Sequence, residues 1–269
     1  MQDDSEAEEK RASERGSQAI NRALSILGLF SVEMPNMNLT DICAATGLTM
    51  PTAHRMVRTL VARDYLVQDP STGRYALGPM LLNVAQIVLQ TSAPGGLVVA
   101  AAPHIENLRN LTEETVGLHV LGPAGRICVA EVPSRHAMRM STGLGTLHPA
   151  YAGAASKALL SAIPPSERSA LLDRQRLVAI TAQTMTSRDD IDADIAAVTE
   201  RGYAMSLGET VEGAGALAAP IRSATHEVIG AINITGPLSR WTQERMIATV
   251  PLLLTEIRAL ELRLGRTSG

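Results

Sequence analysis

The 269-residue sequence has few cysteines, few lysines and no long apolar run. Without 18 consecutive apolar residues, it offers no candidate for a membrane-spanning helix. Residues 1–16 carry six acids against three bases and no hydrophobic segment, so they do not resemble a secretory signal peptide. These absences favour a cytoplasmic protein with no membrane partner. Only two of the 24 basic residues are lysines, which together with abundant alanine is typical of a GC-rich genome.

The two cysteines lie in segments that are predicted to be regular structure. Cys43 falls in a predicted helix, and Cys128 falls in the strand-like run 126–130. We therefore interpret both as small buried hydrophobic residues rather than as disulfide partners or zinc ligands.

The usual motifs of catalytic sites are also missing. The sequence has no His-x-x-x-His pair, no nucleophile elbow and no phosphate-binding glycine loop. An enzyme is still an alternative if His119, His136 and His148 converge near Glu131 or Glu209. We expect no catalytic residue, metal or cofactor, and we interpret Glu209 as a residue that supports a pocket.

Length and composition suit a globular protein of two domains, with 45% hydrophobic and 19% charged residues. We predict a disordered acidic tail at 1–16, a first domain at 17–79, a linker helix and joint at 80–95, and a second domain at 96–269. The joint is placed at residues 92–96, where Ser, Ala, Pro and two Gly follow one another.

Residues 37–78 have the pattern of a helix, a glycine turn, a second helix and a β-hairpin. We predict that Thr40 caps the first helix and that Gly47 ends it in a left-handed turn. Thr49 is predicted to cap the second helix, with Pro51 in the first turn, where a missing N–H is harmless. This order predicts a winged helix-turn-helix.

The second helix exposes only short polar groups and cations opposite its apolar face. At about 13 residues, or roughly 20 Å, it is long enough to lie in a DNA major groove. Strands at 65–67 and 74–77 around the turn-rich segment 69–73 predict the wing. The predicted DNA-binding residues are Arg22, Thr49, Met50, Thr52, His54, Arg55, Arg58 and Arg74.

The net charge of −3 is low for a DNA-binding protein, but the distribution of charge matters more than its sum. Residues 17–80 hold five arginines against four acids, a balance of 5 − 4 = +1. A single copy would hold DNA weakly, so we expect dimerisation to double the contacts. The alternatives are a helix pair with no DNA function and a winged helix that binds a protein.

Two further helices flank this motif. In the first, an apolar face of Ile20, Ala23, Leu24, Leu27 and Phe30 is predicted to cover the helix pair. In the second, residues 80–90 are apolar nearly all round, so this helix needs a partner.

From residue 97 onward, short strands alternate with helices. Helices are predicted at 97–112, 154–163, 166–173, 186–201 and from 240, and strands at 117–121, 127–132, 203–207, 215–221 and 228–235, with an extended stretch at 137–140. Antiparallel strands with flanking helices predict an α+β domain.

Six sequence blocks together resemble the IclR-type bacterial transcriptional regulators, over residues 17 to about 262. They are residues 18–24, 46–48 with 52–55, 73–78, 152–160, 201–213, and 218–221 with 236–237. The resemblance implies an N-terminal winged helix-turn-helix, a linker helix, and a C-terminal GAF-like effector domain with a central antiparallel sheet. It also implies a homodimer or dimer of dimers.

The implied function is that of a ligand-responsive repressor of small-molecule catabolic genes, whose partners are double-stranded operator DNA and a small-molecule effector. The effector pocket is expected under the loop before the Lys157 helix and against the last strands of the sheet. The candidate residues are Leu118, Met138, Met140, Gly153, Ala154, Ala155, Ser206, Ala216, Asn233 and Thr235. The alternative is that they are core residues, although Asn233 lies in an apolar strand and must be hydrogen-bonded.

Departures from the family pattern are informative. Thr49-Met50-Pro51 lacks a cation that family members usually have at the start of the recognition helix, which puts the usual operator in doubt. Relatives that bind small oxoacids have an acid and a cysteine at Ser206 and Ala216. We therefore expect a larger, more apolar carboxylate, with an aromatic one as a candidate, held in part by N–H groups of residues 153–155.

Overall fold

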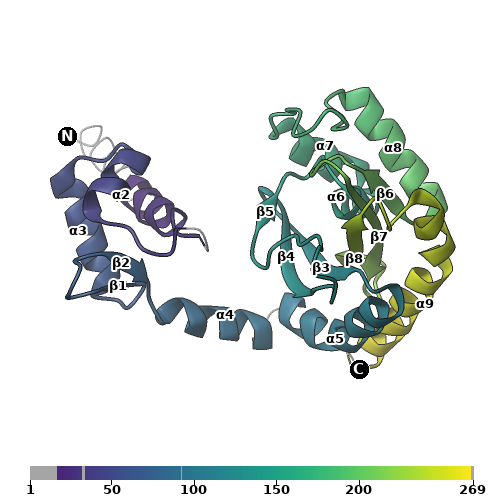
Figure 1. Ribbon diagram of the computed structural model, residues 1–269, viewed down its shortest axis with the longest axis horizontal. Coiled ribbons are helices and arrows are strands. Elements are labelled where there is room, and N and C mark those ends of the chain that lie inside the picture. Colours follow the sequence, from purple (N-terminus) through teal and green to yellow (C-terminus); the bar gives the residue numbers. More distant parts are fainter. Residues whose placement is uncertain (1–16, 32–33, 92, 268–269) are drawn as a thin grey trace, which may run out of the picture. The chain divides into compact units, whose positions relative to one another are not determined.

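The computed structural model describes residues 17–31, 34–91 and 93–267. It divides after Val88 into two compact units (Figure 1). Among the described residues, no helix is both long enough and apolar enough to cross a membrane.

The N-terminal unit is a winged helix-turn-helix, as predicted. Residues 17–27 are helical, and they are followed by α2 (Leu39–Thr46), α3 (Met50–Val61), β1 (Leu66–Gln68) and β2 (Tyr75–Leu77). The two strands pair antiparallel, with Leu66 opposite Leu77. Helices and wing share one core, which includes Ile26, Ile42 and Val57, all fully buried.

The cap of α2 differs from the prediction. Asn38, not Thr40, is the N-cap: its side chain accepts from the Asp41 N–H, and the Asp41 carboxylate accepts from the Asn38 N–H. This reciprocal pair satisfies two free N–H groups. Gly47 ends the helix at a φ of +68°, as predicted. Thr49 is the N-cap of α3, but its hydroxyl lies 3.0 Å from the Thr52 hydroxyl and caps no N–H.

The first helix buries only part of the predicted face. Ala23, Leu27 and Phe30 do pack on the core, around the buried Ile26. Ile20 and Leu24 instead are 62% and 60% exposed. Because Ile26 occupies the centre of the buried stripe, the stripe is rotated away from these two positions.

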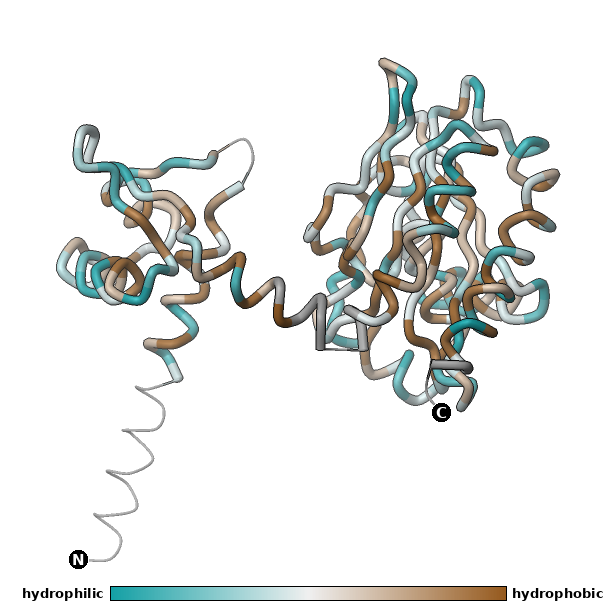
Figure 2. The backbone as a smooth tube through the Cα atoms, turned by 90° about the horizontal axis from the view of Figure 1, so that it is seen from below, coloured by the Kyte–Doolittle hydropathy of each residue, from teal (hydrophilic) through white to brown (hydrophobic). Residues whose placement is uncertain are grey.

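The predicted joint is largely helical. Helix α4 spans Met80–Thr91, and α5 spans Ala93–Thr112. Residues 93–96 therefore begin a helix; Pro94 stands in its first turn, where a proline needs no N–H partner. Figure 2 shows α4 as brown, apolar stretches separated by a polar one. Leu82 and Val84 on this helix are 71% and 41% exposed.

The second unit is built on a six-stranded antiparallel sheet in the order β5-β4-β3-β8-β7-β6. The strands are β3 (Thr115–Gly122), β4 (Gly125–Val132), β5 (Leu147–His148), β6 (Ala204–Leu207), β7 (Ala214–Arg222) and β8 (Val228–Pro237). Cys128 is buried in β4 and Cys43 half-buried in α2, and neither forms a disulfide. Residues 137–140, predicted to be extended, contain bends instead of a strand.

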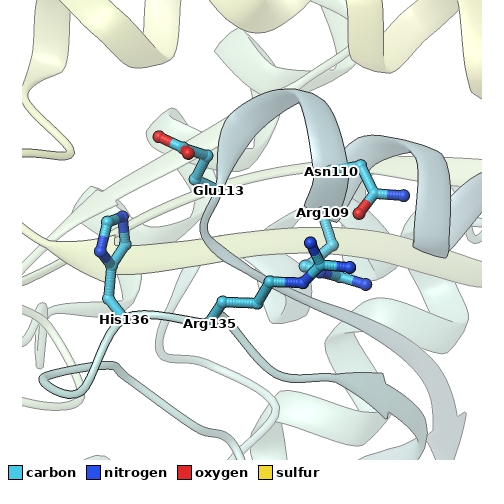
Figure 3. Close-up of a pocket in the computed structure, with 5 residues that line it drawn as sticks. All are labelled: Arg109, Asn110, Glu113, Arg135 and His136. Atoms are coloured by element: carbon cyan, nitrogen blue, oxygen red, sulfur yellow. The ribbon is translucent and has the colours of Figure 1, made fainter.

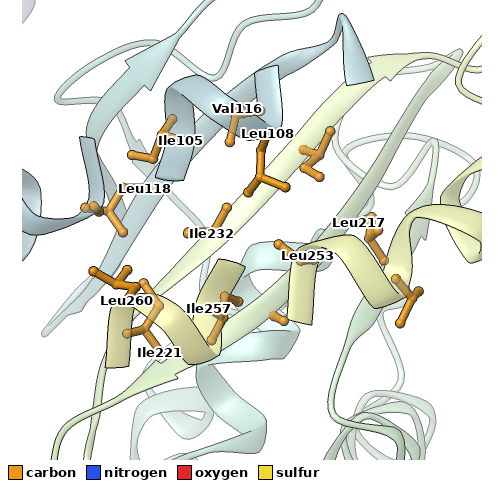
Figure 4. Packing of buried hydrophobic residues seen from close by; sticks show 14 of the residues in the cluster. Ile105, Leu108, Val116, Leu118, Leu217, Ile221, Ile232, Leu253, Ile257 and Leu260 are labelled. Atoms are coloured by element: carbon orange, nitrogen blue, oxygen red, sulfur yellow. The ribbon is translucent and has the colours of Figure 1, made fainter. Parts of the chain in front are cut away.

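Helices cover both faces of this sheet, which makes the unit α+β as predicted. On one face, α5 and α9 (Gln243–Thr267) pack on a large apolar cluster that includes Leu108, Ile232 and Leu253 (Figure 4). On the other face lies α6 (Ala154–Ser161), which in turn contacts α8 (Arg188–Arg201). Helix α7 (Pro165–Asp173) shares a third cluster with α6 and α8. The α6 face of the sheet carries four of the ten predicted effector residues, Ser206, Ala216, Asn233 and Thr235.

Candidate functional site

Helix α3 separates an apolar face from a cationic one. Ala53, Met56, Val57 and Leu60 recur at helical spacing and are buried, which fixes the orientation of the helix. His54, Arg55, Arg58 and Thr59 therefore face solvent. Among the described residues, no carboxylate forms an ion pair with Arg55 or Arg58. This exposed face is available to a polyanion.

The N-terminal end of α3 is neutral and partly apolar. Met50 is 46% exposed, and its Sδ lies 3.9 Å from the Cys43 Sγ of the preceding helix. Thr49 is exposed and Thr52 half-buried, with their hydroxyls paired. Such groups can contact a thymine methyl, but they cannot bind guanine in the bidentate manner of arginine.

The wing adds one cation next to this helix. The Asp69 carboxylate accepts hydrogen bonds from the Ser71 hydroxyl and N–H, and these bonds lower the Asp69 pKa to about 2. Arg74 follows the turn and is exposed; its Nη1 donates to the Asn36 carbonyl over 3.4 Å. Arg22, also predicted to bind DNA, is half-buried on the first helix.

In the second unit, four of the predicted effector residues share one face of the sheet. Ser206 lies opposite Ala216, and Ala216 lies opposite Thr235, so the three form a row across β6, β7 and β8. Ala216 packs on the cluster that contains α6 residues, and paired residues in a sheet point to the same face. Asn233 lies on that face too, opposite Ala218 of the same cluster.

The loop before α6 binds the carboxylate of Glu209. Gly153, at a φ of +87°, donates its N–H to the Glu209 Oε2 over 3.0 Å. Glu209 is buried and also pairs with the Lys157 ammonium, so it holds the loop to α6. Ala154 and Ala155 are buried in the α6 cluster. The carboxylate expected to bind the Gly153 N–H is thus supplied by the protein itself.

Three other predicted residues lie elsewhere. Leu118 is fully buried in the cluster on the α5–α9 face, because neighbouring positions on a strand point to opposite faces. Met138 is 66% exposed. Met140 is half-buried, and its carbonyl accepts from the Thr115 hydroxyl over 2.6 Å. The structure does not bring Leu118 and Met138 together with Asn233.

The α6 face also contains polar groups that were not among the predicted effector residues. Arg126 on β4 is 3% exposed; its Nε donates to the Ser156 Oγ over 2.9 Å, and its Nη1 lies 3.1 Å from the His119 Nδ1. Burial lowers the pKa of Arg126 to about 10, and burial with the nearby Arg126 charge lowers the pKa of His119 well below its usual value. The sequence did contain one signal for this group, because Arg126 stands at the start of an otherwise apolar strand.

The three histidines of the enzyme alternative do not converge. His148 lies across from Arg126 in the β4–β5 pair, near His119, and its Nε2 contacts the Thr142 carbonyl at 2.9 Å. His136 instead lines a separate pocket of about 120 Å³ at the end of α5, with Arg109, Asn110, Glu113 and Arg135 (Figure 3). None of the predicted effector residues lines this pocket.

Comparison with protein families matches both units. The family described as "bacterial transcriptional regulator IclR C-terminal" matches residues 94–261, and the IclR helix-turn-helix domain matches residues 19–70. The glycerol operon regulatory protein of Streptomyces coelicolor is 31% identical over 95% of this chain and 98% of its own length. The transcriptional repressor IclR of Escherichia coli is 29% identical over 92% of this chain and 90% of its own.

Solved structures match more than nine-tenths of the chain. A transcriptional regulator from Rhodococcus sp. RHA1 superposes with a TM-score of 0.78 at 30% identity, covering 93% of this chain and 99% of that one. An IclR homologue from Microbacterium hydrocarbonoxydans, complexed with 4-hydroxybenzoate, has the same fold, with a TM-score of 0.78 at 24% identity over 91% of this chain and 98% of that one. All these relatives are regulators, in agreement with the expectation of a non-enzyme.

Proposed function

Because the chain belongs to the IclR family of bacterial transcriptional regulators, we propose that it is an effector-responsive repressor of small-molecule catabolic genes. A homodimer, or a dimer of dimers, places two copies of α3 in successive major grooves of a pseudopalindromic operator. Effector binding in the second unit shifts the relative placement of the DNA-binding units through α4.

The observation that carries the DNA-binding assignment is the exposed cationic face of α3. Arg55 and Arg58 project opposite the buried stripe of that helix and have no acidic partner among the described residues. We assign base or phosphate contacts to them, to His54 and to Arg74, and apolar contacts to Met50. Thr49, Thr52 and Arg22 complete the proposed interface.

Exposed apolar side chains support the dimer. Ile20 and Leu24 on the first helix and Leu82 and Val84 on α4 are all more than 40% exposed. Isolated exposed apolar residues are ordinary, but four on the two helices that flank the motif in sequence favour a protein partner. A second copy of the chain also doubles the number of cations that contact DNA. This matters because a chain with a net charge of −3 binds DNA weakly as a single copy.

For the effector we propose a small carboxylate bound on the α6 face of the sheet, near Ser206, Ala216, Asn233 and Thr235. Without an acid at Ser206 or a thiol at Ala216, this face suits a larger and less polar carboxylate than a simple oxoacid. A protein of the same fold has been crystallised with 4-hydroxybenzoate, a small aromatic carboxylate.

Binding to the DNA that flanks its own gene tests this proposal. Fluorescence anisotropy would measure the affinity of the purified protein at 50 and 200 mM salt, with and without a panel of small carboxylates. If a dimer neutralises about six phosphates, affinity falls about 10³-fold between these salt concentrations. We expect one carboxylate to weaken binding further.

A second candidate is a winged helix that binds a protein partner. A protein interface gives a much shallower salt dependence, because few counterions are released. DNA binding that is absent, or that changes little with salt or with every carboxylate, would contradict the proposal.

A further inference from the structure

Arg109 is a buried cation whose guanidinium lacks an acceptor. It lies in the last turn of α5, and the residue is only 7% exposed. Its Nε is buried and has no hydrogen-bond acceptor among the described residues. In the same part of the chain, the one carboxylate within ion-pair distance of it is that of Glu106, which is 65% exposed and 4.0 Å from Nη2. A buried guanidinium without acceptors is costly, so an anion from outside the chain would stabilise it.

The pocket at the end of α5 brings a second arginine close to Arg109. Both Arg109 and Arg135 line this pocket of about 120 Å³. Figure 3 shows the Arg135 side chain extending toward Arg109 and Asn110, whereas Glu113 and His136 lie on the other side. Arg135 is exposed, and no carboxylate of the described residues forms an ion pair with it. Two guanidinium groups repel each other, and an anion bound by both removes that repulsion.

A buried serine holds the two sides of the pocket together. Ser134 is 3% exposed; its Oγ donates to the Glu113 carbonyl over 2.5 Å, and its N–H donates to the Thr115 Oγ1 over 3.0 Å. The His136 N–H donates to the same Ser134 Oγ over 3.2 Å. The loop that carries Arg135 is thereby fixed to the turn that follows α5. Such support for the lining residues is what a ligand site requires.

Glu113 stands at this pocket in a strained backbone conformation, with a φ of +61°. The other non-glycine residues with positive φ in the described part of the chain are Asp64 and His226, whose residue types are enriched there, as glutamate is not. A position directly after a helix in this conformation normally favours glycine. The Glu113 carboxylate forms no ion pair among the described residues that would offset the strain. Strain of this kind is typical of ligand-binding positions.

We propose that this pocket is a second ligand site, which binds the phosphate group of a small phosphorylated metabolite. Arg109 and Arg135 donate to the phosphate oxygens, and Glu113 and Asn110, which are exposed, bind hydroxyl groups of the organic part. A phosphate monoester has a charge of about −1.5 to −2 at pH 7 and three acceptor oxygens, which suits two guanidinium groups better than a singly charged anion does.

The size and place of the pocket fit this assignment. Its volume of about 120 Å³ is about four times the share of one water molecule in the liquid, so it has room for a phosphate group and a few further atoms. The pocket lies apart from the proposed effector site, none of whose residues lines it. The inference therefore goes beyond the proposed function.

Calorimetry on the full-length protein tests the site with three matched compounds. Glycerol phosphate and propyl phosphate differ only in the hydroxyl groups, and propanesulfonate replaces the doubly charged phosphate with a singly charged group. We expect glycerol phosphate to bind most tightly and propanesulfonate to bind at least about tenfold more weakly than propyl phosphate. No binding of either phosphate at millimolar concentration, or equal affinity for propyl phosphate and propanesulfonate, overturns the inference.

Arginine variants assign the binding to this pocket. Arg135→Gln changes an exposed residue and should weaken both phosphates at least about tenfold, since it removes a charged donor. The control is Arg139→Gln, an exposed arginine of the same loop that does not line the pocket, and it should change neither affinity. Arg109→Gln should act like Arg135→Gln; if it fails to fold, Arg109→Lys keeps the charge but loses the planar fork, and it should still bind more weakly than wild type. Equal losses from Arg135→Gln and Arg139→Gln would indicate unspecific attraction and overturn the site.

Glu113→Gly separates ligand recognition from structural support. Glycine adopts the left-handed conformation without strain, so this variant should raise the midpoint of thermal unfolding. It should also remove the preference for glycerol phosphate over propyl phosphate, because the acceptor for the hydroxyl groups is lost. An unchanged preference would contradict the role of Glu113. Because binding is measured directly, these results do not depend on whether the protein binds DNA.

Discussion

At the scale of single residues, Lys157 is a buried charge held between two carboxylates. Its ammonium lies 2.7 Å from the Asp194 Oδ2 on α8 and pairs with Glu209, and its side chain is 2% exposed. Glu209 in turn accepts from the Gly153 N–H. One lysine thus ties α6 to α8 and to the loop that precedes α6.

We predict that Lys157→Met lowers the free energy of unfolding by about 3–5 kcal/mol, because two carboxylates lose their buried counter-ion. Chemical denaturation of the full-length protein measures the change. Restoring neutrality with Asp194→Asn and Glu209→Gln in the same chain should recover part of it. As a control, Asp173→Ala breaks an ion pair with Arg188 in which the acid is 65% exposed. This change should lower the free energy of unfolding by at most about 1 kcal/mol. A Lys157→Met protein as stable as wild type would refute this view.

Residue roles were predictable only where they depend on local sequence. Gly47 follows from its position after a helical pattern, and Pro51 from its place in a first turn. The cap at Asn38 was missed because Thr40 is also a good cap, and only the reciprocal bond with Asp41 decides between them. The partnership of Lys157 with Asp194 joins residues far apart in the chain, so no local pattern reports it.

At the scale of elements, the junction between wing and α4 depends on a glycine. Gly78 donates its N–H to the Tyr65 carbonyl over 2.8 Å. A Cβ at this position would lie 2.7 Å from the Asp64 carbonyl carbon and 2.9 Å from that of Tyr65. Backbone atoms cannot move aside as a flexible side chain can, so β2 and the start of α4 fit together only with glycine here.

Gly78→Ala should therefore destabilise the N-terminal unit by about 1–3 kcal/mol or more, with a matching loss of DNA binding. Thermal unfolding followed by circular dichroism measures the change. Gly47→Ala is the matched control: it forces a side chain into a left-handed turn, but nothing lies within 4 Å of the new Cβ, so it should cost only about 1 kcal/mol. If Gly78→Ala were no more harmful than Gly47→Ala, the proposed close packing would be wrong.

Elements were predicted well where apolar periodicity and turn residues coincide. The two motif helices, the wing and the β3–β4 hairpin all have both signals. The joint at 92–96 was read from its Pro and Gly content, but Pro94 is compatible with the first turn of α5. The face of the first helix was misjudged because Ile20 and Leu24 continue an apolar pattern that the core does not use.

At the scale of the whole molecule, sheet order and the α6 face could not be read from the sequence. Strands β3 and β8 are neighbours although more than a hundred residues separate them, and this pairing places Gly117 opposite Asn233 and His119 opposite Ala231. Leu118 was assigned to the effector site because the sequence does not reveal the strand register, which decides the face of the sheet on which a residue lies. The pairing of these two strands is thus a property of the tertiary fold.

In the proposed function, the N-terminal unit binds DNA and the second unit responds to the effector. The most direct measurement is the operator affinity of the Arg55→Ala, Arg58→Ala double variant, by anisotropy over a salt series. The control is Arg176→Ala with Arg258→Ala, two exposed arginines of the second unit. We predict a loss of about 10- to 100-fold and a shallower salt dependence for the α3 variant, with no change for the control. Operator affinity unchanged by the loss of Arg55 and Arg58 would contradict the assignment of α3 as the DNA-binding helix.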